Sequence, residues 1–178
     1  MQLSKDNYKD VNFCLRCGHK LELKQDSEAK VRPKCPNCNW TYYKNPVPAS
    51  ACVIFNEKEE ILLIKRKIPP NKGEWALPSG YIEIYQTPEE AAIDEMEEET
   101  GLVGTVEEYL GFFNDNSPIY EKVLSLGFLM KIIDGKVKAS DDADKAEYFP
   151  ISEHPQICFP SHRFFIKQAL KMRNKLNN

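Results

Sequence analysis

Apolar residues recur along the chain with two spacings, one typical of strands and one typical of helices. Two apolar, β-branched runs at 50–55 and 61–65 flank the polar stretch 56–60, so we expect them to form a β-hairpin. The runs 106–113 and 121–133 also predict strands, and the second alternates apolar and polar positions. These patterns predict a domain whose core is built largely on strands.

A helix is predicted between Thr87 and Gly101. Thr87 precedes Pro88 and has Glu90 three residues on, which is a capping box with proline at the first helical position. Gly101 is suited to end the helix. The side expected to face a core carries Ala92, Ile93, Met96 and Thr100.

A second helix is predicted at the end of the chain. Pro160 interrupts the preceding segment, and residues 161–176 then show helical spacing. One stripe of this segment carries Phe165, Ala169, Met172 and Leu176. We expect that stripe to pack on the core.

The first predicted helix is unusually acidic. It carries seven carboxylates and no Lys or Arg, so like charges repel wherever they fall four residues apart. Glu95, Glu98 and Glu99 fall together beside the core-facing side. Converging carboxylates need a strong positive charge, and hard oxygen ligands suit Mg²⁺ or Mn²⁺. The alternative is a solvated acidic face.

The residues around this helix resemble the box of the Nudix family, G-x5-E-x7-R-E-U-x-E-E-x-G-U, where U is aliphatic. Gly80, Gln86 and the run 94–102, DEMEEETGL, match that pattern in register, and the run 75–80, WALPSG, resembles the usual approach to it. Two positions differ, because Gln86 replaces a glutamate and Asp94 replaces an arginine. If these changes weaken the site, Gln86→Glu combined with Asp94→Arg should raise hydrolysis.

The resemblance implies an α+β Nudix fold, a mixed β-sheet sandwiched by helices, over residues 49–178. It also implies metal-dependent hydrolysis of a nucleoside diphosphate linked to another moiety, of the ADP-ribose, FAD or NADH type. Glu95, Glu98 and Glu99 would be catalytic and hold Mg²⁺ or Mn²⁺, and the backbone around Gly80 would close the metal site. An acidic residue in a later loop would assist the attacking water, and that role falls on Asp142.

Two alternatives remain open for the function and for the substrate contacts. A Nudix-fold protein weakened by Gln86 and Asp94 could instead bind a nucleotide or RNA without turnover. Arg66 could hold a substrate phosphate or belong to an exposed charge cluster. An aromatic residue such as Phe55 or Tyr81 could stack on a base, or it could pack in the core.

The N-terminal segment carries a second metal-binding pattern. Cys14 and Cys17 form one C-x2-C pair and Cys35 and Cys38 form another, separated by seventeen residues. This spacing predicts a structural zinc site with four thiolates and no open position. Two disulfides are the alternative, which would need an oxidising compartment.

The segments between the cysteine pairs predict how this site is built. The stretches 20–24 and 29–33 alternate apolar and charged residues around a polar turn and predict a hairpin. Residues 1–45 are therefore expected to form a zinc ribbon, with a stiff proline-containing connector at 45–48. Its basic and aromatic residues make RNA binding possible, although packing is the simpler use of them.

Composition narrows these expectations. With 178 residues, 42% of them hydrophobic, the chain can bury one ordinary core and carry a small appendage. A net charge of −3 gives no general attraction to nucleic acid. We find no signal-peptide pattern and no apolar run long enough to span a bilayer, so a cytoplasmic protein is expected. The resemblance implies a small-molecule nucleotide substrate and a possible homodimer.

Overall fold

The computed structural model describes residues 8, 11–27, 29–139 and 143–176 of the chain. The chain divides into two compact units, Met1–Asn45 and Pro46–Asn178. Within the described residues, no helix is both long and apolar enough to cross a membrane.

The N-terminal unit contains the predicted hairpin. β1 (Glu22–Gln25) pairs antiparallel with β2 (Val31–Lys34), and Glu22 lies opposite Lys34. Near the turn, Arg32 Nε donates to Asp26 Oδ2 at 2.9 Å. The hairpin prediction is confirmed.

The C-terminal unit contains two sheets. Its strands are β3 (Val47–Ile54), β4 (Ile61–Arg66), β5 (Trp75–Ala76), β6 (Ser79–Tyr81), β7 (Leu102–Ser117), β8 (Glu121–Gly135) and β9 (Ala143–Phe149). One sheet has the order β6-β3-β8-β7 and the other has the order β5-β4-β9. β3 runs parallel to β8 and antiparallel to β6, so the larger sheet is mixed.

The predicted hairpin of β3 and β4 is wrong. The two strands meet only at one bridge, between Phe55 and Ile61, and then enter different sheets. β3 pairs with β6 and β8, whereas β4 pairs with β5 and β9. An apolar run that is buried on both faces shows that a strand exists but does not identify its partner.

The two helices form where the sequence predicts them. α1 spans Pro88–Thr100 and α2 spans Pro160–Leu176. The Thr87 side chain accepts from the backbone N–H of Glu90, and the Glu90 carboxylate accepts from the backbone N–H of Thr87, so the capping box is complete. Gly101 then ends α1 with a φ of 69°, a left-handed conformation that glycine adopts without strain.

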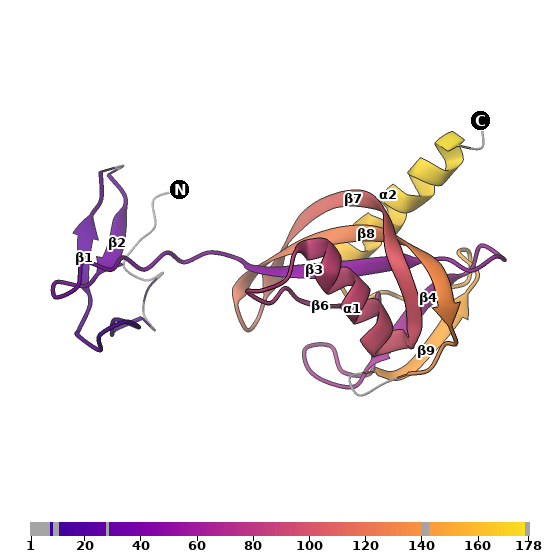
Figure 1. Ribbon diagram of the computed structural model, residues 1–178, viewed down its shortest axis with the longest axis horizontal. Helices are drawn as coiled ribbons and strands as arrows, with labels where there is room; N and C mark the ends of the chain where they lie inside the picture. Colours follow the sequence, from indigo (N-terminus) through magenta and orange to yellow (C-terminus); the bar gives the residue numbers. More distant parts are fainter. Residues whose placement is uncertain (1–7, 9–10, 28, 140–142, 177–178) are drawn as a thin grey trace. The chain divides into compact units, whose positions relative to one another are not determined.

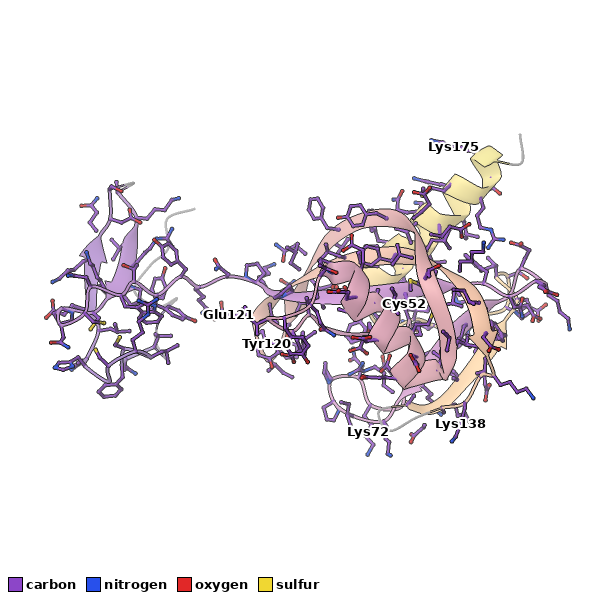
Figure 2. All side chains as sticks on the ribbon, viewed as in Figure 1. Cys52, Lys72, Tyr120, Glu121, Lys138 and Lys175 are labelled. Carbon is purple, nitrogen blue, oxygen red and sulfur yellow. The ribbon has the colours of Figure 1, made fainter. Side chains whose placement is uncertain are left out.

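The larger sheet is covered by a helix on each face, because alternate residues of β3 belong to two core clusters. Ala51 and Val53 pack in one cluster with Phe165 of α2. Cys52 and Ile54 pack in the other cluster, which includes two α1 residues, Ala92 and Met96. Figure 1 shows α1 beside β3 and β6, and Figure 2 labels Cys52 in the interior of this unit. The predicted mixed sheet between helices is confirmed.

Candidate active site

The acidic helix is tied to the larger sheet at both of its ends. Near its start, Ser50 Oγ of β3 donates to the Pro88 carbonyl oxygen at 2.7 Å. Near its end, Ser79 N of β6 donates to Glu99 Oε2 at 2.8 Å. Glu99 is only 7% exposed, so this bond fixes a buried carboxylate against the strand. Both contacts hold α1 beside the run that resembles the Nudix box.

Glu95 lies directly over Gly80. A Cβ atom built on Gly80 would fall 1.7 Å from Glu95 Oε1, a distance at which atoms overlap. A side chain at position 80 would therefore displace the Glu95 carboxylate from its present place. Gly80 lies beside one of the three glutamates, and its role at a metal site stays a prediction of the family resemblance.

Glu95, Glu98 and Glu99 line one cavity of about 720 Å³. Glu98 is exposed, Glu95 is half-buried and Glu99 is buried. The three carboxylates therefore line the cavity at different depths below the protein surface. Within the described part of the chain, these three are not gathered into a compact ligand set, because the one such set is formed by cysteines. Three carboxylates on one cavity wall still have the chemistry that a hard divalent cation prefers.

Gln86 and Asp94, the two departures from the family pattern, contact each other. Gln86 Nε2 donates to Asp94 Oδ2 at 2.7 Å, and Gln86 Oε1 accepts from the backbone N–H of Glu83 at 2.9 Å. An amide can perform both roles at once, whereas a glutamate at position 86 could not donate to Asp94. Neither side chain lines the cavity. The pair therefore joins the 83–86 loop to α1 outside the cavity lining.

Arg66 reaches the same cavity from the end of β4. Its Nε donates to the Pro70 carbonyl oxygen at 2.8 Å, and its guanidinium carbon lies 5.2 Å from the centre of the Phe159 ring. These contacts hold a cation at the cavity wall, where phosphate oxygens can reach its remaining donors. Arg66 therefore lines the same cavity as the glutamates, and its contact with a substrate phosphate stays a prediction.

His162 adds a neutral hydrogen-bonding group to the cavity wall. Its Nδ1 accepts from the backbone N–H of Leu77 at 3.0 Å, so the ring proton resides on Nε2. Burial, aided by the positive charges of Arg66 and Arg163, lowers the pKa of His162 to about 3. The imidazole is therefore uncharged near neutral pH and acts as a donor rather than as a cation.

The aromatic residues expected at the substrate have different positions. Tyr81 lines the cavity and packs edge-on against Tyr120, with ring centres 5.3 Å apart. Tyr120 lies in the β7–β8 turn and is labelled in Figure 2. Phe55 does not line the cavity, since it packs in the core beneath the guanidinium of Arg173. The structure therefore gives Phe55 no route to a substrate there. Asp142 lies outside the described residues.

Other cavity residues had no signal in the sequence. Asp115 lies near the end of β7, Ser125 lies near the start of β8, and His162 lies within the first turn of α2. Strand periodicity marks such positions as buried or exposed but does not mark a polar residue as a ligand contact. These three residues are recognised as cavity residues only when the positions of β7, β8 and α2 around one cavity are known.

The four N-terminal cysteines form a compact cluster. Their sulfur atoms all lie within 4.8 Å of one another, and Cys17 Sγ is 3.4 Å from Cys35 Sγ and 3.6 Å from Cys38 Sγ. These distances are too long for disulfides, whose sulfurs lie about 2.05 Å apart. They resemble the separation of about 3.8 Å that follows from four Zn–S bonds in a tetrahedron. The cluster is compatible with zinc.

Comparisons with known proteins agree with this geometry. A model described as the NUDIX domain matches residues 45–168. The chain is 41% identical over 123 residues to an ADP-ribose pyrophosphatase of Methanocaldococcus jannaschii, covering 68% of this chain and 72% of that protein. It is 27% identical over 163 residues to the NAD-capped RNA hydrolase NudC of Pseudomonas aeruginosa, covering 90% of this chain.

The chain spans about half of that NudC protein, 54% of its length. Among solved structures, a NUDIX hydrolase from Nitrosomonas europaea matches with a TM-score of 0.78 and 26% identity, covering 93% of each chain. The similarity to this structure extends over nearly the whole chain, whereas the family model matches residues 45–168.

The Gln86–Asp94 contact predicts compensation between the two positions. Gln86→Glu should lower the free energy of unfolding by about 0.5–1 kcal/mol, because two carboxylates would then face each other at an exposed site. Adding Asp94→Arg should restore stability by creating an ion pair. A double-mutant cycle in urea measures this coupling.

The same double variant should keep wild-type turnover, since the pair lies outside the cavity. The sequence alone led to the opposite expectation, a gain in hydrolysis. A large gain in kcat would show that Gln86 and Asp94 weaken the native site.

The lowered pKa of His162 predicts a loss of stability in acid. Between pH 6.5 and about 3 the unfolded chain takes up a proton that the folded protein excludes. Stability from this group is therefore complete above pH 6.5 and falls below it, by at most about 1.4 kcal/mol per pH unit. Urea unfolding from pH 7 to pH 5 should show a smaller decline for His162→Gln, which keeps an acceptor but does not titrate. Equal slopes would contradict this account.

Proposed function

Because this chain belongs to the Nudix family, we propose that it is a metal-dependent diphosphatase acting on ADP-ribose or a related compound of the FAD or NADH type. The observation that carries the proposal is the meeting of Glu95, Glu98 and Glu99 with Arg66 at one cavity. Carboxylates suit a divalent cation and a guanidinium suits a diphosphate. The ADP-ribose pyrophosphatase relative supports the choice of substrate class.

In this proposal each side chain has a defined task. Glu95, Glu98 and Glu99 hold Mg²⁺ or Mn²⁺, which when bound lowers the pKa of a water and offsets charge at the attacked phosphorus. Arg66 binds a non-bridging phosphate oxygen. Water attacks one phosphorus, the bond from that phosphorus to the bridging oxygen breaks, and two phosphorylated products leave. Asp142 remains the predicted acidic assistant of that water.

The remaining cavity residues would orient the substrate. Ser79 keeps Glu99 in place through its backbone N–H, and Gly80 leaves space for the Glu95 carboxylate. His162 can donate from Nε2 to a phosphate or sugar oxygen without adding charge. The Tyr81 ring gives a base an aromatic surface at the cavity wall.

An NAD-capped RNA end is the second candidate substrate. The NudC relatives support it because the alignment extends over 90% of this chain. In the N-terminal unit, the Arg32 guanidinium lies 4.7 Å from the centre of the Tyr43 ring, an arrangement able to contact a nucleotide. A homodimer also remains a prediction, which size-exclusion chromatography with light scattering tests directly.

The enzyme assignment predicts turnover that depends on Glu98. Phosphate release should be measured with ADP-ribose, FAD, NADH and NAD-capped RNA, using Mg²⁺ or Mn²⁺ and excess phosphatase. Glu98→Gln should lower kcat by about 100-fold or more, since it removes charge at the metal. Glu97→Gln is the matched control, because Glu97 is exposed and does not line the cavity.

Equal activity of the Glu97 and Glu98 variants would exclude the proposed site. No turnover on any substrate, together with intact nucleotide binding by calorimetry, would favour the alternative of a nucleotide-binding Nudix protein without catalysis.

We also propose that Cys14, Cys17, Cys35 and Cys38 hold a structural Zn²⁺ in a ribbon over residues 1–45. The sulfur separations support this, and so do matching turns at Gly18 and Asn39, which have φ values of 73° and 58°. Thiolate ligands persist in reducing compartments, which supports a cytoplasmic location as part of the proposal.

Zinc removal should unfold the ribbon and spare the larger unit. After chelation, hydrogen exchange should accelerate at the β1–β2 pair while amides of β3 and β8 keep their protection. Metal analysis should find one zinc per chain before chelation. If the amides of β1 and β2 stay protected from hydrogen exchange after verified zinc loss, the structural role of the zinc is contradicted.

A further inference from the structure

Asp115 is a buried carboxylate that lacks a full set of partners. It lies in β7 and is 7% exposed. Its Oδ1 is fully buried and has no hydrogen-bond partner in the described part of the chain. Its Oδ2 receives one long contact, from Ser125 Oγ at 3.5 Å. An unsatisfied buried carboxylate is costly, so its presence calls for a donor that arrives from elsewhere.

The cavity that contains the three glutamates is the place from which such a donor can come. Asp115 and Ser125 both line it, together with Arg66 and the glutamates. Hydroxyl rotation lets Ser125 donate to Asp115 or to a ligand, but it leaves Oδ1 unpaired. A ligand group with an N–H or O–H would satisfy that oxygen after a small movement of the side chain.

Asp115 lies on the α2 side of the larger sheet, whereas the three glutamates lie on the α1 side. Ser50 of β3 bonds to the start of α1, whereas the neighbouring Ala51 packs in the α2 cluster, so successive β3 residues face opposite sides. Ala49 and Ser125 are in register and therefore share the α2 side. Asp115 is two residues from Phe113, which is in register with Ser125 and packs on Phe164 of α2.

Two parts of the cavity can therefore hold two parts of one ligand. The glutamates on the α1 side suit the diphosphate and its cation, and Asp115 on the other side suits a neutral, donor-bearing group. In a nucleoside diphosphate derivative such donors are the amino group of the base and the sugar hydroxyls. A second phosphate would be repelled by the carboxylate.

We propose that Asp115 is a specificity residue that accepts a hydrogen bond from an N–H or O–H donor of the substrate beyond its diphosphate. The inference rests on the proposed function for the class of substrate. It does not depend on turnover, because the contact belongs to binding.

The test combines Asp115→Asn with a non-hydrolysable ligand, the α,β-methylene analogue of ADP-ribose. Calorimetry should show binding weakened by about 10- to 100-fold, the usual effect of losing a hydrogen bond to a charged group. Asp134→Asn makes the same chemical change at an exposed position outside the cavity and should bind as wild type does.

Thermal unfolding separates a binding role from a structural one. If the ligand is the missing partner, Asp115→Asn without ligand should melt at the same temperature as wild type or higher, because it removes an unsatisfied buried charge. A structural carboxylate would instead lower the melting temperature on substitution. That result, or binding within twofold of wild type, overturns the proposal.

Three analogues identify the source of the donor. They lack, in turn, the amino group of the base, the hydroxyls of the nucleoside ribose and the hydroxyls of the distal ribose. The analogue that lacks the contacting donor should bind wild type and Asp115→Asn equally, while the other two should keep the difference. If wild type and Asp115→Asn still differ in affinity for all three analogues, the proposed hydrogen bond to Asp115 is overturned.

The outcomes also distinguish this proposal from the proposed function. Asp115-dependent binding without turnover of ADP-ribose would refute the diphosphatase activity and leave the Asp115 contact standing. Turnover of ADP-ribose with no effect of Asp115→Asn on kcat/KM would support the diphosphatase activity and refute the Asp115 contact. Wild type that fails to bind the methylene analogue at all refutes the Asp115 contact.

Discussion

Electrostatic repulsion along α1 is the constraint on which the rest of the site depends. Seven carboxylates lie on thirteen residues that include no Lys or Arg. The capping box, the buried faces of Ala92 and Met96 and the bond from Ser79 to Glu99 hold the helix in place. A divalent cation would offset the repulsion among the carboxylates that line the cavity, and catalysis would then use those same carboxylates.

The fold converts this acidic helix into one wall of a larger cavity. α1 and α2 cover opposite faces of the mixed sheet, and the cavity includes residues from both sides of it. Gln86 and Asp94 change the family pattern at a contact between residues that do not line that cavity. The pattern is therefore altered in the connection between loop and helix, while all three glutamates and Gly80 are retained at the cavity.

The sequence was sufficient for local elements and insufficient for their partners. Thr87, Pro88 and Gly101 defined α1 because capping is a local interaction. β3 and β4 were recognised as strands but wrongly paired, since runs buried on both faces do not reveal which strand lies beside them. Tyr81 and Phe55 looked equivalent in sequence, and only tertiary packing separates a cavity residue from a core residue. Asp115 carried no sequence signal at all.

Binding of Mn²⁺ tests the central claim that the acidic side of α1 is a metal site. Titration followed by electron paramagnetic resonance, with zinc retained in the protein, reports free and bound Mn²⁺ directly. The account predicts saturable binding that Glu98→Gln largely removes, and that the Gln86→Glu, Asp94→Arg double variant preserves. Wild type that binds no Mn²⁺, or a Glu98→Gln variant that binds it as wild type does, would contradict the account.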